Sequence, residues 1–150
     1  MELILLRHGE AEFGLPDNAR RLTSAGQKQV IKMANSYGQN MAGTELVLTS
    51  PLHRALQTTE LFMSNTDLNC NLQIVDFLLP DSSVEAVERQ LQAFDDKKIL
   101  MVGHLPLLDN WIDYLTGGYR ATMATASLAS LTMDYAYKGL ARLNWIHHVD

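Results

Sequence analysis

The first ten residues, Met1 to Glu10, read MELILLRHGE. Residues 3–6 form an uninterrupted run of leucine and isoleucine, which is typical of a strand that is buried on both faces of a parallel sheet. Parallel strands present ligand-binding residues at their carboxyl ends, and this strand ends at Arg7, His8 and Gly9. We therefore expect these three residues to lie at a binding edge of the sheet.

The chemistry of this triplet points to phosphate. The guanidinium of Arg7 offers a planar fork of hydrogen-bond donors that matches phosphate oxygens, and the imidazole of His8 can act as a nucleophile or proton carrier near neutral pH. Gly9 permits a sharp turn and a close approach by a ligand. The triplet predicts a phosphate site with a histidine nucleophile, although it also fits a strand end with two solvated polar side chains.

Residues 45–49, which contain the apolar triplet Leu46-Val47-Leu48, predict another buried strand. It leads directly into a helix predicted over residues 51–63, with Ser50 as its cap and Pro51 at its first position. Arg54 then falls on the first turn, where a cation opposes the helix dipole. An anion held beside Arg54 would remove that conflict, so we expect Arg54 to serve a binding site.

A third apolar run, residues 99–102, predicts a strand that ends at Gly103 and His104. This strand repeats the design of the first one, because it too would deliver an imidazole, flanked by glycine, to the carboxyl edge of a sheet. A single histidine after a strand would carry little meaning. Two histidines in equivalent places, with Arg7 and Arg54 at similar edges, predict one shared site.

The rest of the chain alternates between helical and strand patterns. Apolar residues recur at helical spacing between capping and breaker residues, which predicts helices over residues 25–36, 84–94 and 107–115. Alternation of apolar and polar residues predicts an edge strand over residues 72–75. The same alternation predicts a hairpin whose two strands cover residues 127–133 and 140–146. His147 and His148 are expected to form a frayed tail, because no acidic or thiol ligands lie near them in the sequence.

Composition limits the class of protein. The chain has 150 residues, which fits one domain over residues 1–150, and its net charge of -5 argues against non-specific binding to nucleic acid or acidic membranes. No apolar run approaches the length of a membrane span or a signal peptide. A single cysteine, Cys70, excludes an internal disulfide and is compatible with a reducing compartment. We therefore expect a cytoplasmic protein with a local basic pocket.

Three motifs occur in a meaningful order along the chain: Arg7-His8-Gly9, the pattern Ser-Pro-x-x-Arg-Ala-x-Gln-Thr over residues 50–58, and Gly103-His104. Their order and spacing resemble the histidine phosphatase superfamily, whose fold is phosphoglycerate mutase-like. The match is closest to the SixA-type phosphohistidine phosphatases, because the segments around Arg20 to Gly26, His104 to Leu107 and Thr125 to Ser130 also resemble that subfamily.

The resemblance implies an α/β fold: a three-layer α/β/α sandwich on a mostly parallel six-stranded sheet with one antiparallel strand. It also implies that His8 attacks phosphorus and becomes phosphorylated, while Arg7, Arg54 and His104 hold the phosphoryl oxygens. The two guanidiniums and the histidine can supply the charge and donors that phosphoryl transfer needs, so we expect no metal and no cofactor.

Further roles follow from the same resemblance. Gly9, Arg20 and Ser127 are candidate substrate-binding residues, and the role of Arg20 is the least defined. For attack through an unprotonated nitrogen, the other ring nitrogen of His8 should donate to an acceptor, and a main-chain carbonyl is expected.

The sequence departs from larger relatives in one respect. They supply a carboxylic acid that protonates an alkoxide leaving group, whereas Leu78 occupies the corresponding place here. Substitutes could be Glu10, Glu12 or Asp81. A site without a strong general acid would favour a phosphoramidate bond over an ester, because the imidazole of phosphohistidine is a good leaving group once protonated.

The predicted function is therefore hydrolysis of phosphohistidine on a partner protein, either a histidine phosphotransfer domain or a phosphocarrier. The chain has no large insertion that could form a lid, so a side chain projecting from another protein could enter the site. A monomer is expected. The alternatives are a phosphomonoesterase for small molecules such as sugar phosphates, a non-catalytic phosphate-binding regulatory module, and a metal hydrolase that uses His8 and His104.

Overall fold

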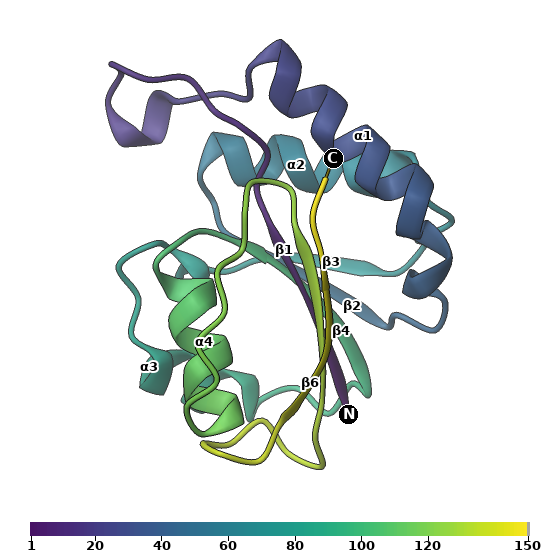
Figure 1. Cartoon of the computed structure of the whole chain (residues 1–150), viewed down its shortest axis with the longest axis vertical. Helices are drawn as coiled ribbons and strands as arrows, with labels where there is room; N and C mark the ends of the chain where they lie inside the picture. Colours follow the sequence, from purple (N-terminus) through teal and green to yellow (C-terminus); the bar gives the residue numbers. More distant parts are fainter. Residues whose placement is uncertain (150) are drawn as a thin grey trace.

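A computed structural model describes residues 1–149 of the chain, which form one six-stranded sheet with helices on both of its faces (Figure 1). In chain order the elements are β1 (Glu2–Arg7), η1 (Asp17–Ala19), α1 (Ser24–Tyr37), η2 (Gly38–Met41), β2 (Leu46–Thr49), α2 (His53–Ser64), β3 (Asn71–Ile74), η3 (Asp76–Leu78), α3 (Val84–Leu91), β4 (Lys98–Gly103), α4 (Leu107–Thr116), β5 (Leu128–Thr132) and β6 (Arg142–His147).

The strand order is β3-β2-β4-β1-β5-β6, so β1 lies in the interior of the sheet between β4 and β5. β1 pairs in parallel with β4, and Arg7 lies opposite Gly103. β2 pairs in parallel with both β3 and β4, whereas β5 runs antiparallel to β1 and to β6. This topology confirms the predicted mostly parallel sheet with one antiparallel strand. It also brings the carboxyl ends of β1, β2 and β4 to one edge.

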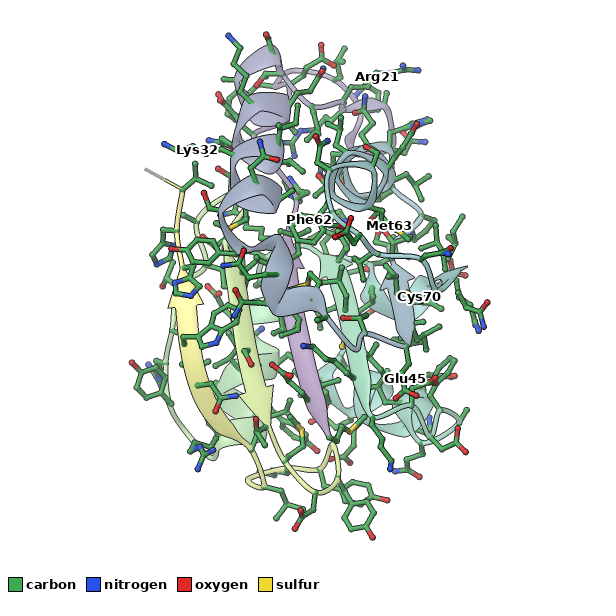
Figure 2. The ribbon with its side chains drawn as sticks, turned by 90° about the vertical axis from the view of Figure 1, so that its right-hand side faces the viewer. Arg21, Lys32, Glu45, Phe62, Met63 and Cys70 are labelled. Carbon is green, nitrogen blue, oxygen red and sulfur yellow. The ribbon has the colours of Figure 1, made fainter. Side chains whose placement is uncertain are left out.

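The two faces of the sheet have separate apolar layers, because side chains alternate along each strand. Ile4 and Leu6 of β1 pack with residues of α1 and α2 on one face. Leu3 and Leu5 pack with residues of α3 and α4 on the other face. Figure 2 shows the first of these layers, with Phe62 of α2 between its helix and the sheet, where it is fully buried. The predicted three-layer sandwich is thus confirmed.

Local signals explain most helix boundaries. The hydroxyl of Thr23 accepts a hydrogen bond from the Gly26 N–H at the start of α1, and Ser83 does the same for Ala86 at the start of α3. Gly117 ends α4 in the left-handed conformation, with a φ of 76°. The predicted end of the third helix was wrong, because α3 stops at Leu91 rather than at residue 94.

The predicted start of α2 was also wrong. The helix begins at His53, and its N-cap is Leu52, which has extended backbone angles. Pro51 therefore lies before the helix, and Ser50 is not its cap. The hydroxyl of Ser50 instead accepts a hydrogen bond from the Leu52 N–H and lies 2.7 Å from Nε2 of His104.

The predicted hairpin at the sheet edge is confirmed by β5 and β6, but the predicted frayed tail after it was wrong. His147 is the last residue of β6, and its ring stacks on Tyr37 and on Trp145, with centroid distances of 3.9 Å and 4.4 Å. Nδ1 of His148 lies 2.7 Å from Oγ of Ser127. Aromatic stacking against α1 therefore orders the end of the chain as far as it is described.

The helices within residues 1–149 do not include one that is both long enough and apolar enough to cross a membrane.

Candidate active site

The four residues predicted to form the core of the site meet at the carboxyl edge of the sheet. Arg7 is the last residue of β1 and His8 follows it, His104 follows β4, and Arg54 lies on the first turn of α2 after β2. The rings of His8 and His104 have centroids 5.1 Å apart at an angle of 51°. His8, Arg54 and His104 are almost fully buried, with exposed fractions of 6%, 3% and 1%. Such burial of polar side chains at a strand edge indicates a built site rather than a solvated surface.

His8 has a defined tautomer. Its Nδ1 lies 2.7 Å from the carbonyl oxygen of Gly9, which can only accept a hydrogen bond, so Nδ1 carries the ring hydrogen and Nε2 carries a lone pair. The pKa of His8 is lowered to about 4, mainly by burial and to a smaller extent by the charges of Arg54, Arg7 and Arg20, against the opposing effect of the Gly9 hydrogen bond. His8 is therefore a neutral imidazole at pH 7, with Nε2 available as a nucleophile.

His104 is also held in its neutral form. Burial lowers its pKa to about 2, with smaller contributions from His8 and the nearby arginines. Its Nε2 lies 2.7 Å from Oγ of Ser50. Its Nδ1 is buried and has no hydrogen-bond partner among the described residues. The Ser50 hydroxyl can donate to Nε2, which would leave the ring hydrogen on Nδ1.

The guanidinium of Arg54 is held at one end by Asp17. Nη1 donates to the carbonyl oxygen of Asp17 at 2.8 Å, and Nη2 lies 3.1 Å and 3.3 Å from the two carboxylate oxygens of the same residue. Burial lowers the pKa of Arg54, whereas Asp17 opposes that effect. Nε of Arg54 is buried without a partner in the described part of the chain.

Arg7 is anchored in a similar way. Its Nη1 donates to the carbonyl oxygen of Met123 at 2.9 Å. Burial lowers the pKa of Arg7, and the nearby charge of Asp109 opposes that effect. Nε of Arg7, like that of Arg54, is buried and has no partner within residues 1–149.

Three unpartnered nitrogens therefore gather at this edge. The described residues contain four buried side-chain polar atoms without a partner, and all but Trp111 Nε1 belong to Arg7, Arg54 and His104. Buried donors are rarely left unsatisfied unless a site uses them. An anion with several oxygens, such as a phosphoryl group, would satisfy them together while presenting its central atom to Nε2 of His8.

Arg20 joins the site through the loop that carries Asp17. Its Nε donates to the carbonyl oxygen of Glu12, and its Nη1 lies 3.4 Å from the Asp17 carboxylate. The charge of Arg20 lowers the pKa of both His8 and His104, which places it within electrostatic reach of the two rings. The neighbouring Arg21 is exposed, and Figure 2 shows it at the periphery of the molecule.

Gly9 is required by close packing. A Cβ added at Gly9 would lie 2.6 Å from the carbonyl oxygen of Gly26 in α1, a distance that real Cβ atoms do not tolerate. The N–H of Gly9 donates to the hydroxyl of Thr58 at 3.1 Å. Gly9 thus allows α1 to approach the loop after β1, and its direct role in substrate binding stays a prediction.

Ser127 is buried beside β1. Its carbonyl oxygen accepts a hydrogen bond from the N–H of Arg7 at 3.1 Å, and its hydroxyl pairs with His148. The preceding residue, Ala126, has a positive φ of 59° and donates its N–H to the carbonyl oxygen of His8. These contacts fix the main chain around Arg7 and His8, whereas contact between Ser127 and substrate stays a prediction.

None of the three candidate general acids contacts His8 or His104. Within residues 1–149, no hydrogen bond or ion pair joins Glu10, Glu12 or Asp81 to His8 or His104. Asp81 is exposed and lines a surface hollow of about 500 Å³ next to Asp17. Leu78, which occupies the place of the acid, is fully buried in the apolar layer on the α3 and α4 face.

The carboxylates that do reach the site were not anticipated from the sequence. Asp17 binds Arg54 directly, and Asp109 accepts a hydrogen bond from the N–H of Met123, whose carbonyl binds Arg7. Weak sequence signals exist for both, since Asp17 lies three residues before Arg20 and Asp109 lies on the first turn of α4. Ser50 was misassigned as a helix cap, although it stands beside His104.

Within the described residues, no group of three or more histidine, cysteine, aspartate or glutamate side chains is arranged to hold a metal ion.

Comparisons with known proteins agree with this geometry. The family model described as Histidine phosphatase superfamily (branch 1) matches residues 3–77. The solved structure of the protein histidine phosphatase SixA complexed with tungstate is 30% identical and has a TM-score of 0.89, with 99% of this chain and 97% of that chain covered. An uncharacterized protein of Picosynechococcus sp. is 33% identical over 125 residues, which cover 79% of this chain and 74% of that protein.

A more distant structure shares the fold. A mutant phosphoserine phosphatase from Entamoeba histolytica, solved in complex with phosphoserine, has a TM-score of 0.71 at 18% identity, with 97% of this chain and 95% of that chain covered. The family match and the full-length likeness to SixA lead to one conclusion. The chain belongs to the histidine phosphatase superfamily, branch 1.

Proposed function

We propose that the protein hydrolyses phosphohistidine on a partner protein through a phosphorylated His8 intermediate. The observation that carries this proposal is the state of His8: its Nδ1 donates to Gly9, so the lone pair of Nε2 is directed away from the main chain, and the ring remains neutral at pH 7. The unpartnered donors of Arg7, Arg54 and His104 would hold the phosphoryl oxygens around that nucleophile.

In the first step, Nε2 of His8 forms a bond to phosphorus while the bond from phosphorus to the partner's imidazole nitrogen breaks. The partner ring is protonated on its other nitrogen, so it leaves as a neutral imidazole and needs no further proton from the enzyme. Arg7 and Arg54 stabilise the charge on the equatorial oxygens, which is the main requirement of phosphoryl transfer.

In the second step, a water oxygen forms a bond to phosphorus and the bond from phosphorus to Nε2 breaks. Inorganic phosphate is released with the protons of the water shared between phosphate and solvent, and His8 returns to its neutral form. The hydrogen bond from Nδ1 to Gly9 persists throughout, so the ring keeps its orientation in both steps.

The lack of a general acid beside His8 and His104 in the described part of the chain favours cleavage of a nitrogen–phosphorus bond over cleavage of a phosphate ester. Leu78 is buried and apolar where larger relatives supply an acid, and no carboxylate within residues 1–149 forms a hydrogen bond with His8 or His104. An alkoxide leaving group would lack proton donation, which typically contributes a hundredfold or more to rate. The likeness to SixA, a protein histidine phosphatase at 30% identity, supports the same substrate class.

The test is single-turnover dephosphorylation of a phosphohistidine carrier protein, run beside a panel of phosphate monoesters. We expect rapid loss of phosphate from the carrier, weak ester turnover, and no turnover by His8→Ala. The matched control is His53→Ala, because His53 is an exposed histidine outside the site and its replacement should leave turnover unchanged.

Other outcomes would replace the proposal. Strong ester turnover with an inert carrier would establish the alternative of a small-molecule phosphomonoesterase. Phosphate binding without any turnover would establish a non-catalytic binding module. A cytoplasmic location and a monomeric state stay predictions.

A further inference from the structure

Met123 links two charged residues that are far apart in the sequence. Its side chain is fully buried in the apolar layer beneath α4, and both of its main-chain polar groups are bound. The N–H donates to Oδ1 of Asp109 at 3.0 Å, and the carbonyl oxygen accepts from Nη1 of Arg7 at 2.9 Å. A loop without helix or strand after Gly117 is therefore fixed at the point where it touches Arg7.

Asp109 is well placed to hold this loop. It lies on the first turn of α4, where a carboxylate is favoured by the helix dipole. Burial raises its pKa, while the Met123 hydrogen bond and the charge of Arg7 oppose that effect. Trp111 and Ile112 of α4 are fully buried, and their packing fixes the position of the helix that carries the Asp109 carboxylate.

The same arrangement serves both arginines of the site. In Arg54, Nη1 is held by a main-chain carbonyl of Asp17, and Nε is buried without a partner in the described chain. In Arg7, Nη1 is held by the Met123 carbonyl, and Nε is again buried and unpartnered. Each guanidinium is therefore anchored through its terminal nitrogens, by Nη1 in Arg7 and by Nη1 and Nη2 in Arg54, which leaves Nε of both groups without a partner among the described residues.

We propose that Asp109 is a positioning residue for Arg7. By holding the N–H of Met123, it keeps the Met123 carbonyl aimed at Nη1 and so orients Nε of Arg7 toward the phosphoryl group. The inference rests on the proposed function, because it assigns Arg7 to the phosphoryl oxygens. Orientation of this kind matters because a small displacement of a charged donor lowers transition-state stabilisation steeply.

The experiment compares Asp109→Ala and Asp109→Asn with Asp113→Ala as the matched control. Asp113 lies one turn later on α4, and its side chain has no hydrogen-bond or ion-pair partner in the part of the chain that the structure describes. Two quantities are measured: the dissociation constant of inorganic phosphate, followed by ³¹P NMR, and the single-turnover rate with a phosphohistidine carrier protein.

We expect Asp109→Ala to weaken phosphate binding and slow turnover by about tenfold each, the size of one hydrogen bond's contribution. Asp109→Asn keeps an oxygen that can accept from the Met123 N–H, so it should recover most of both losses. Asp113→Ala should match the wild type. If Asp109→Ala does not fold, Asp109→Ser gives the same comparison, because its hydroxyl is too short to reach Met123.

Two results would overturn the inference. Equal behaviour of Asp109→Ala and Asp113→Ala would show that Arg7 does not depend on Asp109. Equal damage by Asp109→Asn and Asp109→Ala would show that the carboxylate charge or its proton is needed, not the hydrogen bond. Phosphate binding separates this inference from the proposed function. If the wild type does not dephosphorylate the carrier but Asp109→Ala still binds phosphate more weakly than the wild type, the positioning role stands and the proposed function is rejected.

Discussion

At the residue scale, Arg54 shows how a residue placed against its local preference can mark a site. A cation on the first turn of α2 opposes the helix dipole, and the structure shows that the carboxylate of Asp17 offsets this charge. The side chain of Asp17 is 61% exposed, so this ion pair contributes little to stability. The ion pair instead fixes the position of the guanidinium, whose Nε is buried and has no partner among the described residues.

We predict that Arg54→Ala lowers single-turnover dephosphorylation by 10²-fold or more, the typical effect of removing one transition-state donor. The free energy of unfolding should change little, because an exposed Asp17 loses its partner without becoming a buried unpaired charge. The measurement is the turnover rate together with urea unfolding, and the exposed Arg21→Ala is the matched control. Unchanged turnover in Arg54→Ala would remove this residue from the site.

We also predict that chelating agents leave turnover unchanged. The positive charge opposite the phosphoryl oxygens would come from Arg7 and Arg54, which need no metal ion to carry it. The measurement is the single-turnover rate with and without EDTA, and a metal-dependent phosphatase in the same buffer shows that chelation is effective. A loss of activity that added metal restores would contradict this mechanism.

At the element scale, the site depends on how closely α1 approaches the loop after β1. A Cβ on Gly26 would lie 2.0 Å from the carbonyl oxygen of Glu10, and a Cβ on Gly9 would lie 2.6 Å from the carbonyl oxygen of Gly26. Main chain meets main chain at this crossing, so no side-chain rotation can relieve a clash. The two glycines are required at this crossing by space, because neither has a positive φ.

We predict that Gly26→Ala destabilises the protein by about 3 kcal/mol, because α1 must move away from the nucleophile loop. Gly38→Ala is the matched control: this residue lies at the end of α1 with a helical φ of -59°, and its added Cβ meets Thr66, whose methyl group is the nearest atom at 3.1 Å. Urea unfolding of both variants measures the difference. Equal stability of the two variants would mean that the crossing can open without penalty.

At the scale of the whole molecule, two buried neutral histidines couple stability to pH. The folded pKa of His8 is about 4 and that of His104 is about 2, both below the ordinary value of 6.5. Below pH 6.5 the unfolded chain therefore binds protons that the folded chain does not. This stability is fully present above pH 6.5. As the pH falls, it is lost progressively from 6.5 toward 4 for His8 and from 6.5 toward 2 for His104.

We predict a loss of about 2 kcal/mol for each of these imidazoles between pH 7 and pH 5, since one pH unit corresponds to about 1.4 kcal/mol. Urea unfolding at the two pH values measures the loss. The double variant His8→Asn, His104→Asn should show a smaller loss than the wild type, and His53→Ala serves as the control. An equal loss in the double variant would assign the pH dependence to other groups.

The architecture of the site could be predicted because short apolar strands of a parallel sheet all end at one edge. The runs at residues 3–6, 45–49 and 99–102 place Arg7, His8 and His104 there, and the helix after the second run adds Arg54. Helix boundaries were less certain. Ser50 followed by Pro51 is a common helix start, yet the hydroxyl of Ser50 lies beside His104 and the helix begins two residues after Pro51.

The sequence by itself determined the strands, their shared edge and the four charged or imidazole side chains on it, because hydrophobic period and strand ends are local properties. Only the tertiary structure decided how those side chains are oriented. Asp17 is 37 residues from Arg54, and Met123 is 116 residues from Arg7. These contacts use main-chain carbonyls, which every residue possesses, so no residue pattern marks them before the chain folds.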